Sequence, residues 1–222
     1  FNQGEVCTCP SRAMIHEDIY EPFMEMVKAR VNALNCGTPF SLDTQVGAQA
    51  SGEQFEKIMS YMDIGRQEGA NVIFGGEKRS MDGALSGGYY VQPTAFKGNN
   101  NMRVFQEEIF GPVLSVVNLD HFDDAMDIIN THEFGNGTSI YTSNGTFARN
   151  FMKNVQIGMV GINVPIPVPM AFYSFGGWKG SIFGGHGMHG EEGINFYTKR
   201  KTITSRWPED VAGASLNMPT MK

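Results

Sequence analysis

The stretch Val113-Leu114-Ser115-Val116-Val117-Asn118-Leu119 is a nearly continuous apolar run of strand length. A strand of this composition is typical of a parallel sheet whose two faces are both covered. Apolar residues at helical spacing follow it directly, at Phe122, Ala125, Met126 and Ile129. A buried strand followed by an amphipathic helix is one step of an α/β fold.

The same alternation extends in both directions from this run. Periods of two and of three to four residues predict strands over residues 11–16, 72–74, 90–96, 138–142 and 159–164 and helices over 19–34, 55–69 and 147–155. Asp18 is the expected cap of the first helix. The alternation predicts a mostly parallel α/β sheet with right-handed crossovers. Because open sheets bind ligands beyond the carboxyl ends of their strands, we expect the site in loops that follow strands.

Composition places the chain among globular proteins of one or two domains. It has 222 residues, of which 41% are hydrophobic and 18% charged, and its net charge is -6. The acidic balance gives no support for nucleic acid or an anionic membrane surface as a partner, and no apolar run has the length of a membrane span. Three cysteines form no disulfide framework and favour a reducing compartment. His186 and His189 lack a third ligand, so no metal site is expected.

Cys7 is the residue whose surroundings best suit covalent chemistry. It follows a turn that contains Gly4 and precedes the apolar strand residues Ala13 to Ile15. Backbone N–H groups beside such a thiol can stabilise both a thiolate and the oxyanion that forms when it attacks a carbonyl. The structural alternative is that Cys7 is a small packed hydrophobe, as most free cysteines are.

Three segments, in this order, resemble the signatures of the NAD(P)-dependent aldehyde dehydrogenase superfamily. They are Asn2-Gln3-Gly4-Glu5-Val6-Cys7 with Ser11-Arg12, Glu107-Glu108-Ile109-Phe110-Gly111-Pro112-Val113, and Ser174-Phe175-Gly176-Gly177-Trp178-Lys179. The resemblance implies the open, mostly parallel, three-layer α/β sheet of that family's catalytic domain over residues 1–198. It also implies an oligomerisation strand and tail over residues 199–222, where residues 201–207 are similar to the family's last strand.

The resemblance also implies roles for single residues. Cys7 corresponds to the nucleophile, which forms a thiohemiacetal and then a thioester with a small aldehyde. Glu108 corresponds to the carboxylate that binds the nicotinamide ribose, and Phe110 to the aromatic residue beside the nicotinamide ring. Gln54 and Lys57 align with positions that contact the other end of the cofactor, NAD or NADP. The structural alternatives are a capping acid, a core phenylalanine and two solvated helix residues.

The family's remaining machinery lies upstream of the nucleophile. The NAD-binding domain, the oxyanion-hole asparagine and the glutamate that activates water are therefore expected outside this chain. We accordingly predict a catalytic-domain fragment that does not turn over by itself, that exposes an associating face, and that forms a homo-oligomer, a dimer or a tetramer, when full length. A cytoplasmic location is predicted, with mitochondrial targeting left open because the sequence starts at Phe1.

The two halves of the chain resemble different subfamilies. Residues 1–113 are similar to acetaldehyde-type enzymes, and the sequence from Gly135 onward is similar to CoA-acylating methylmalonate-semialdehyde dehydrogenases, with a join near residues 107–117. A recombinant hybrid and a natural mosaic both stay open, as do water and CoA as acyl acceptors. In the second group an arginine before the nucleophile holds the substrate carboxylate. Val6 stands there, which predicts small uncharged aldehydes. A non-catalytic oligomerisation or interaction fragment is the remaining alternative.

Overall fold

Strands and short helices alternate along the chain, as the sequence periods predict. The computed structural model describes residues 1–205 and 207. The strands are β1 (Arg12–His16), β2 (Asn71–Phe74), β3 (Thr94–Lys97), β4 (Val113–Leu119), β5 (Phe134–Gly135), β6 (Gly137–Ile140), β7 (Met159–Ile162) and β8 (Trp178–Lys179). The α-helices are α1 (Glu17–Asn32), α2 (Gly52–Gln67), α3 (Arg103–Gln106), α4 (Phe122–Thr131), α5 (Gly145–Asn154) and α6 (Gly190–Tyr197), and the 3₁₀ turns are η1 (Asn2–Gly4) and η2 (Gly83–Leu85).

A four-stranded sheet in the order β1-β4-β3-β2 forms the centre of the molecule. β1 and β3 run parallel to β4, whereas β2 pairs antiparallel with β3, to which it is joined without an intervening α-helix. β6 pairs parallel with β7, and β5 pairs antiparallel with β8. The predicted α/β, mostly parallel fold is confirmed, and the ladders are divided among three sheets.

Adjacent residues of β4 point into two separate cores, because successive side chains of a strand face opposite sides of the sheet. Val117 packs in a cluster with Ile58 and Met62 of α2, and Val116 packs in a second cluster with Tyr20 of α1. Phe96 of β3 is fully buried in the first cluster. The two helices therefore cover opposite faces of the sheet, which is the three-layer arrangement.

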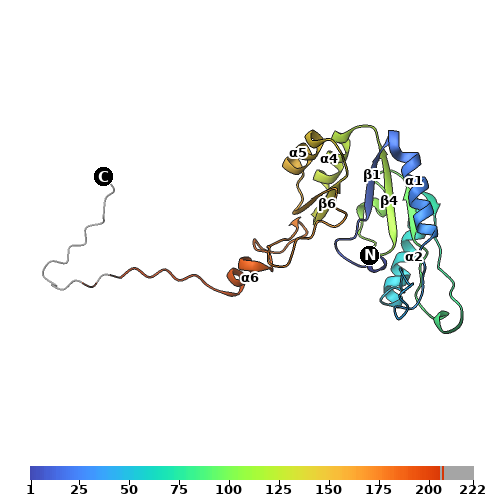
Figure 1. Ribbon diagram of the computed structural model, residues 1–222, viewed down its shortest axis with the longest axis horizontal. Coiled ribbons are helices and arrows are strands. Elements are labelled where there is room, and N and C mark those ends of the chain that lie inside the picture. The colour runs from blue at the N-terminus through green and yellow to red at the C-terminus, as the bar shows by residue number, and fades with distance from the viewer. Residues whose placement is uncertain (206, 208–222) are drawn as a thin grey trace.

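A third core joins the remaining helices to the smaller sheets. Buried residues of α4 and α5, among them Ile129 and Phe151, pack together with partly buried residues of β6 and β7. Figure 1 shows α4, α5 and β6 grouped beside the edge of the central sheet that carries β1. Met14 of β1 also packs against this cluster and links it to the central sheet.

Local capping differs from the expectation in one place. The predicted cap Asp18 lies inside the first turn of α1, and the N-cap is His16, whose Nδ1 accepts a hydrogen bond of 3.3 Å from the Asp18 N–H. β1 runs into α1 without a loop, so the last strand residue takes the capping position. Ser51 caps α2 by accepting a 3.1 Å hydrogen bond from the Gln54 N–H.

The C-terminal part of the chain contains two elements that the periods did not predict, β8 and α6. Beyond α6 the chain leads away from the sheets (Figure 1). The predicted oligomerisation strand at residues 199–222 stays a prediction: residues 199–205 pair with no strand of the described chain, and residues 206 and 208–222 lie outside the described residues. No helix within the described ranges has the length and apolar character needed to cross a membrane.

Candidate active site

Cys7 lies in a turn directly before β1. The Cys9 N–H closes this turn on the Val6 carbonyl at 2.9 Å, and the Cys7 side chain is exposed. The preceding segment is anchored through the Glu5 carboxylate, which accepts hydrogen bonds from the Ala50 N–H at 3.1 Å and from Gln3 Nε2 at 2.8 Å. The thiol is thus presented to solvent on a loop whose base is fixed.

Backbone contact joins this loop to the segment before β4. Gly4 has a φ of +83°, and a Cβ at this position would lie only 2.1 Å from the Gly111 carbonyl oxygen. Glycine is required here both by the left-handed backbone and by the close approach. The glycines of the first and second signature segments therefore hold the two segments against each other.

One pocket brings three predicted site residues together. Cys7, Glu108 and Phe110 all line it, together with Val6 and Arg12. The expectation of a site in loops after strands is wrong for this pocket: Cys7 precedes β1 and Glu108 precedes β4, so the pocket lies at the amino ends of these parallel strands.

Phe110 adopts an unusual backbone conformation within this pocket. Its φ is +61°, in the left-handed region that bulky residues rarely occupy. Gln54 of α2 holds the segment by donating from Nε2 to the carbonyl oxygens of Ile109, at 3.1 Å, and of Phe110, at 2.7 Å. Gln54 and the exposed Lys57 do not line the pocket, and their contact with a cofactor stays a prediction.

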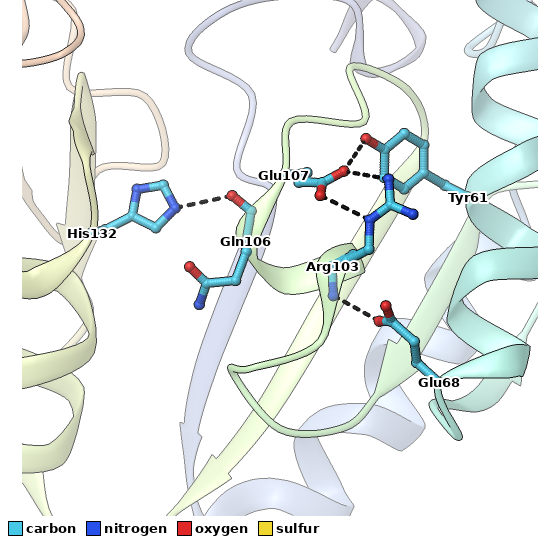
Figure 2. A network of polar contacts seen from close by, with 6 residues as sticks. All are labelled: Tyr61, Glu68, Arg103, Gln106, Glu107 and His132. Atoms are coloured by element: carbon cyan, nitrogen blue, oxygen red, sulfur yellow. Dashed lines mark hydrogen bonds and ion pairs between the residues drawn. The ribbon is translucent and has the colours of Figure 1, made fainter.

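Glu107, the first acid of the Glu-Glu pair, lies in a hydrogen-bond network that we did not predict from the sequence. Its carboxylate accepts hydrogen bonds from Arg103 Nε at 2.8 Å, from Arg103 Nη2 at 2.9 Å and from the Tyr61 hydroxyl at 2.6 Å (Figure 2). The bonds from Arg103 and then from Tyr61 lower the pKa of Glu107 to about 2. The Arg103 N–H in turn donates to the Glu68 carboxylate at 2.7 Å. Glu107 is therefore tied to α2 and α3, while the neighbouring Glu108 is exposed in the pocket.

Lys179 of the third signature segment forms hydrogen bonds with the C-terminal end of α4. Lys179 Nζ donates to the carbonyl oxygens of Ile129, Asn130 and His132 at 3.2, 2.9 and 3.0 Å, so it satisfies the C-terminal end of α4. His132 Nε2 makes a 3.2 Å contact with the Gln106 carbonyl oxygen just before Glu107 (Figure 2). The pKa of Lys179 is lowered, first by burial and then by the charge of Arg12.

Asn136 connects this region to the turn that holds Cys7. It lies between β5 and β6, and its Nδ2 donates a 2.9 Å hydrogen bond to the Cys7 carbonyl oxygen. No sequence signal identified this contact, because it joins residues 129 positions apart. For the Arg103 and Glu107 pair the signal was present, since the two residues are four positions apart and of opposite charge.

The described residues contain no group of three or more His, Cys, Asp or Glu side chains arranged to hold a metal ion. The pocket is lined by two thiols, two carboxylates, two aromatic rings, one hydroxyl and one guanidinium, which belong to Cys7, Cys9, Glu107, Glu108, Phe105, Phe110, Ser11 and Arg12. A thiol beside hydrogen-bonding and aromatic groups is suited to covalent attack on a carbonyl compound.

Comparisons with known proteins identify the family of this chain. Residues 1–203 match the aldehyde dehydrogenase family. An aldehyde dehydrogenase of Rhodospirillum rubrum is 50% identical over 188 residues, which are 85% of this chain and 37% of that protein. Acetaldehyde dehydrogenase 2 of Cupriavidus necator is 50% identical over 183 residues, 82% of this chain and 36% of that protein. The chain thus spans little more than a third of these curated relatives.

Solved structures of aldehyde dehydrogenases have the same fold as this chain. Methylmalonate-semialdehyde dehydrogenase from Oceanimonas doudoroffii superposes with a TM-score of 0.89 at 38% identity, over 95% of this chain and 43% of that one. A double mutant of betaine aldehyde dehydrogenase from Staphylococcus aureus, in complex with NAD⁺, gives a TM-score of 0.87 at 31% identity, over 97% of this chain and 42% of that one.

Proposed function

Because the chain belongs to the aldehyde dehydrogenase family, we propose that it carries the nucleophile and part of the cofactor site of an enzyme that oxidises a small aldehyde with NAD or NADP. The observation that supports this most directly is the shared pocket of Cys7, Glu108 and Phe110. These residues come from two segments about a hundred positions apart, and packing of Gly4 against Gly111 holds the segments together.

In the proposed reaction the Cys7 thiolate attacks the aldehyde carbon. A carbon–sulfur bond forms, and the carbonyl π electrons move to the oxygen, giving a thiohemiacetal oxyanion that backbone N–H groups of the turn stabilise. Bound NAD(P)⁺ supplies the acceptor for the hydride that leaves this carbon as the thioester forms. Water or CoA then takes the acyl group, and the carbon–sulfur bond breaks to return the thiolate.

The residues present fit a nicotinamide cofactor. The exposed Glu108 carboxylate is an acceptor for ribose hydroxyl groups, and the half-buried Phe110 ring offers an apolar surface to a flat heterocycle. Gln54 and Lys57 on α2 are proposed for the distant end of the cofactor. Gln54 also fixes the carbonyl oxygens of Ile109 and Phe110, so its loss would disturb both ends.

We propose small uncharged aldehydes as substrates. Val6 lines the pocket directly before Cys7 and offers no charge to a substrate carboxylate. A buried hydrogen bond to a charged group is worth about 1.5–3 kcal/mol, which is a discrimination of roughly ten- to a hundredfold.

A CoA-acylating semialdehyde dehydrogenase is the second candidate. The likeness to methylmalonate-semialdehyde dehydrogenase favours it. Either way, the division into a catalytic domain at 1–198 and an oligomerisation strand and tail at 199–222, the separate NAD-binding domain, and the homo-oligomeric whole enzyme are parts of the proposal. A non-catalytic interaction fragment is the outcome if Cys7 proves inert.

The test is a graft of this chain behind the upstream part of the acetaldehyde dehydrogenase 2 relative. NADH formation is followed with propanal and with malonate semialdehyde. We expect a higher kcat/KM for propanal, loss of activity in Cys7→Ala, and retained activity in the matched control Cys9→Ala. Val6→Arg should shift the preference toward the semialdehyde by about ten- to a hundredfold. Activity that survives Cys7→Ala contradicts the proposal, and a semialdehyde preference with Val6 in place contradicts its substrate part.

A further inference from the structure

Asn136 makes a direct hydrogen bond to the backbone of the nucleophile turn. Its Nδ2 lies 2.9 Å from the carbonyl oxygen of Cys7. Within residues 1–205 and 207 this is the one hydrogen bond that the Cys7 carbonyl accepts. Because the peptide unit is planar, holding this carbonyl fixes the orientation of the whole Cys7–Thr8 peptide.

The backbone of Asn136 is itself held from two sides. The Met159 N–H donates to the Asn136 carbonyl at 3.1 Å, and the Gly158 N–H donates to the Gly135 carbonyl at 3.0 Å. On the other side the Gly135 N–H donates to the Ser181 hydroxyl at 3.0 Å. The Asn136 side chain therefore projects from a fixed point.

The third signature segment, residues 174–179, helps to hold the backbone around Asn136 in place. β8 pairs with β5, so that Gly135 lies opposite Trp178, and the Gly180 N–H donates to the Glu133 carbonyl at 3.0 Å. A Cβ on Gly158 would lie 2.0 Å from the Gly176 carbonyl oxygen, which shows how closely the segment packs on the start of β7. The segment thus connects to Cys7 through Asn136 without touching the thiol.

We propose that Asn136 is a positioning residue for Cys7: its amide fixes the nucleophile turn, and the third signature segment acts on the nucleophile through it. This inference rests on the proposed role of Cys7. The neighbouring contacts of the turn are the Cys9 N–H to Val6 bond and the contact of Cys9 Sγ with the Phe1 carbonyl oxygen, both within residues 1–9. Only the Asn136 bond ties the described turn to the β5–β6 connection.

The experiment measures the alkylation rate of each cysteine in the chain with iodoacetamide across pH, by mass spectrometry of the peptides. Wild type is compared with Asn136→Asp, Asn136→Ala and Asn136→Gln. Asn195→Asp, on an exposed position of α6, is the control for the added charge. The buried Cys36 reports the integrity of the fold, and Cys9 reports general opening of the loop.

We expect Cys7 to react faster than Cys9 and Cys36 in wild type and to slow at least threefold near neutral pH in Asn136→Asp. The aspartate removes the donor and places a negative charge beside the turn, which disfavours the thiolate. Asn136→Ala should also slow Cys7, whereas Asn136→Gln, which keeps an amide donor, should recover part of the rate. Asn195→Asp should leave Cys7 unchanged.

Two results would overturn the inference and leave the function of Cys7 standing. One is a fast Cys7 whose rate and pH profile are the same in wild type, Asn136→Asp and Asn136→Ala. The other is a rise of Cys36 labelling in these variants, which would make Asn136 a residue of fold maintenance. A wild-type Cys7 no faster than Cys9 would instead contradict the proposed nucleophile itself.

Discussion

The sheet region, residues 12–119, and the C-terminal region, residues 164–205, both contain many large apolar side chains. The two regions differ in how far these side chains are buried. In the sheet region they fill two cores around β4, and Phe96, Ile58 and Val116 are fully buried. In the described residues of the C-terminal region no large apolar side chain is buried. Those that are exposed are Val164, Val168, Met170, Phe172, Tyr173, Trp178, Phe183, Met188, Ile194, Phe196, Tyr197 and Ile203.

The difference shows that two kinds of contact stabilise this fold. The sheet region depends on burial of side chains between a sheet and its helices. The C-terminal region depends on close backbone approach, as between Gly158 and Gly176, and on side-chain hydrogen bonds to backbone, as in the cap that Lys179 Nζ provides for α4. A region that exposes this many large apolar side chains is also typical of an interface. Substitutions in the two regions should therefore have effects of different size.

The largest effect is expected for Phe96→Ala. Phe96 is 0% exposed, so the truncation leaves a cavity in the main core. We expect the free energy of unfolding to fall by about 3–5 kcal/mol, measured by urea unfolding. A loss below about 1 kcal/mol would contradict the central position of this core.

The next largest loss of stability is expected at the backbone contact between Gly4 and Gly111, beside the pocket. Gly4→Ala places a Cβ against the Gly111 carbonyl and in a left-handed conformation, which should cost about 1–3 kcal/mol. Gly185→Ala is the matched control in the C-terminal region, because a Cβ there meets no atom within 4 Å. Unfolding and Cys7 alkylation are measured together. Equal stability of both variants would show that the Gly4–Gly111 contact does not hold the two segments.

A smaller effect is expected at the exposed Glu107 network. The pKa of Glu107 is held at about 2, below its ordinary value of 4.5, so its bonds contribute stability above about pH 4.5 that is lost as the pH falls toward 2. Glu107→Gln should lower stability at neutral pH, and its difference from wild type should shrink over this window. Glu191→Gln on α6 is the charge control. A difference that stays constant with pH would contradict the role of the ionised carboxylate.

The smallest effect is expected for Phe183→Ala. Phe183 is 96% exposed, and removal of its ring should change the free energy of unfolding by no more than about 0.5 kcal/mol. The same substitution should reduce concentration-dependent association, measured by light scattering, if the exposed apolar surface is an interface. A destabilisation close to that of Phe96→Ala would remove the distinction between the two regions.

The spacing of apolar residues along the sequence predicted the helices and strands that bury side chains. β1, α1, α2 and β4 have long, regular patterns, and their observed bounds lie close to the predicted ones. β5, β8 and α3 are only two to four residues long, which is too short for a period to be visible. α6 buries no residue. Its sequence therefore lacks the apolar spacing that packing against a core would impose, and this helix was not predicted.

The site was predictable only in part. Cys7, Glu108 and Phe110 were identified through resemblance, and the structure places them in one pocket, but periodicity misplaced that pocket at the carboxyl ends of the strands. The contacts of Asn136 and Lys179 depend on how distant segments pack, which no local pattern encodes. The join between two subfamilies near residues 107–117 stays a prediction.

The central claim is that this chain holds a nucleophilic Cys7 at the amino ends of β1 and β4, and acylation by p-nitrophenyl acetate tests it most directly. An activated ester needs only the nucleophile for its first step. We predict a burst of close to one nitrophenolate per chain and an acetyl group on Cys7, both absent in Cys7→Ala and retained in Cys9→Ala. No burst, or an acetyl group found on Cys9 instead, would contradict the account.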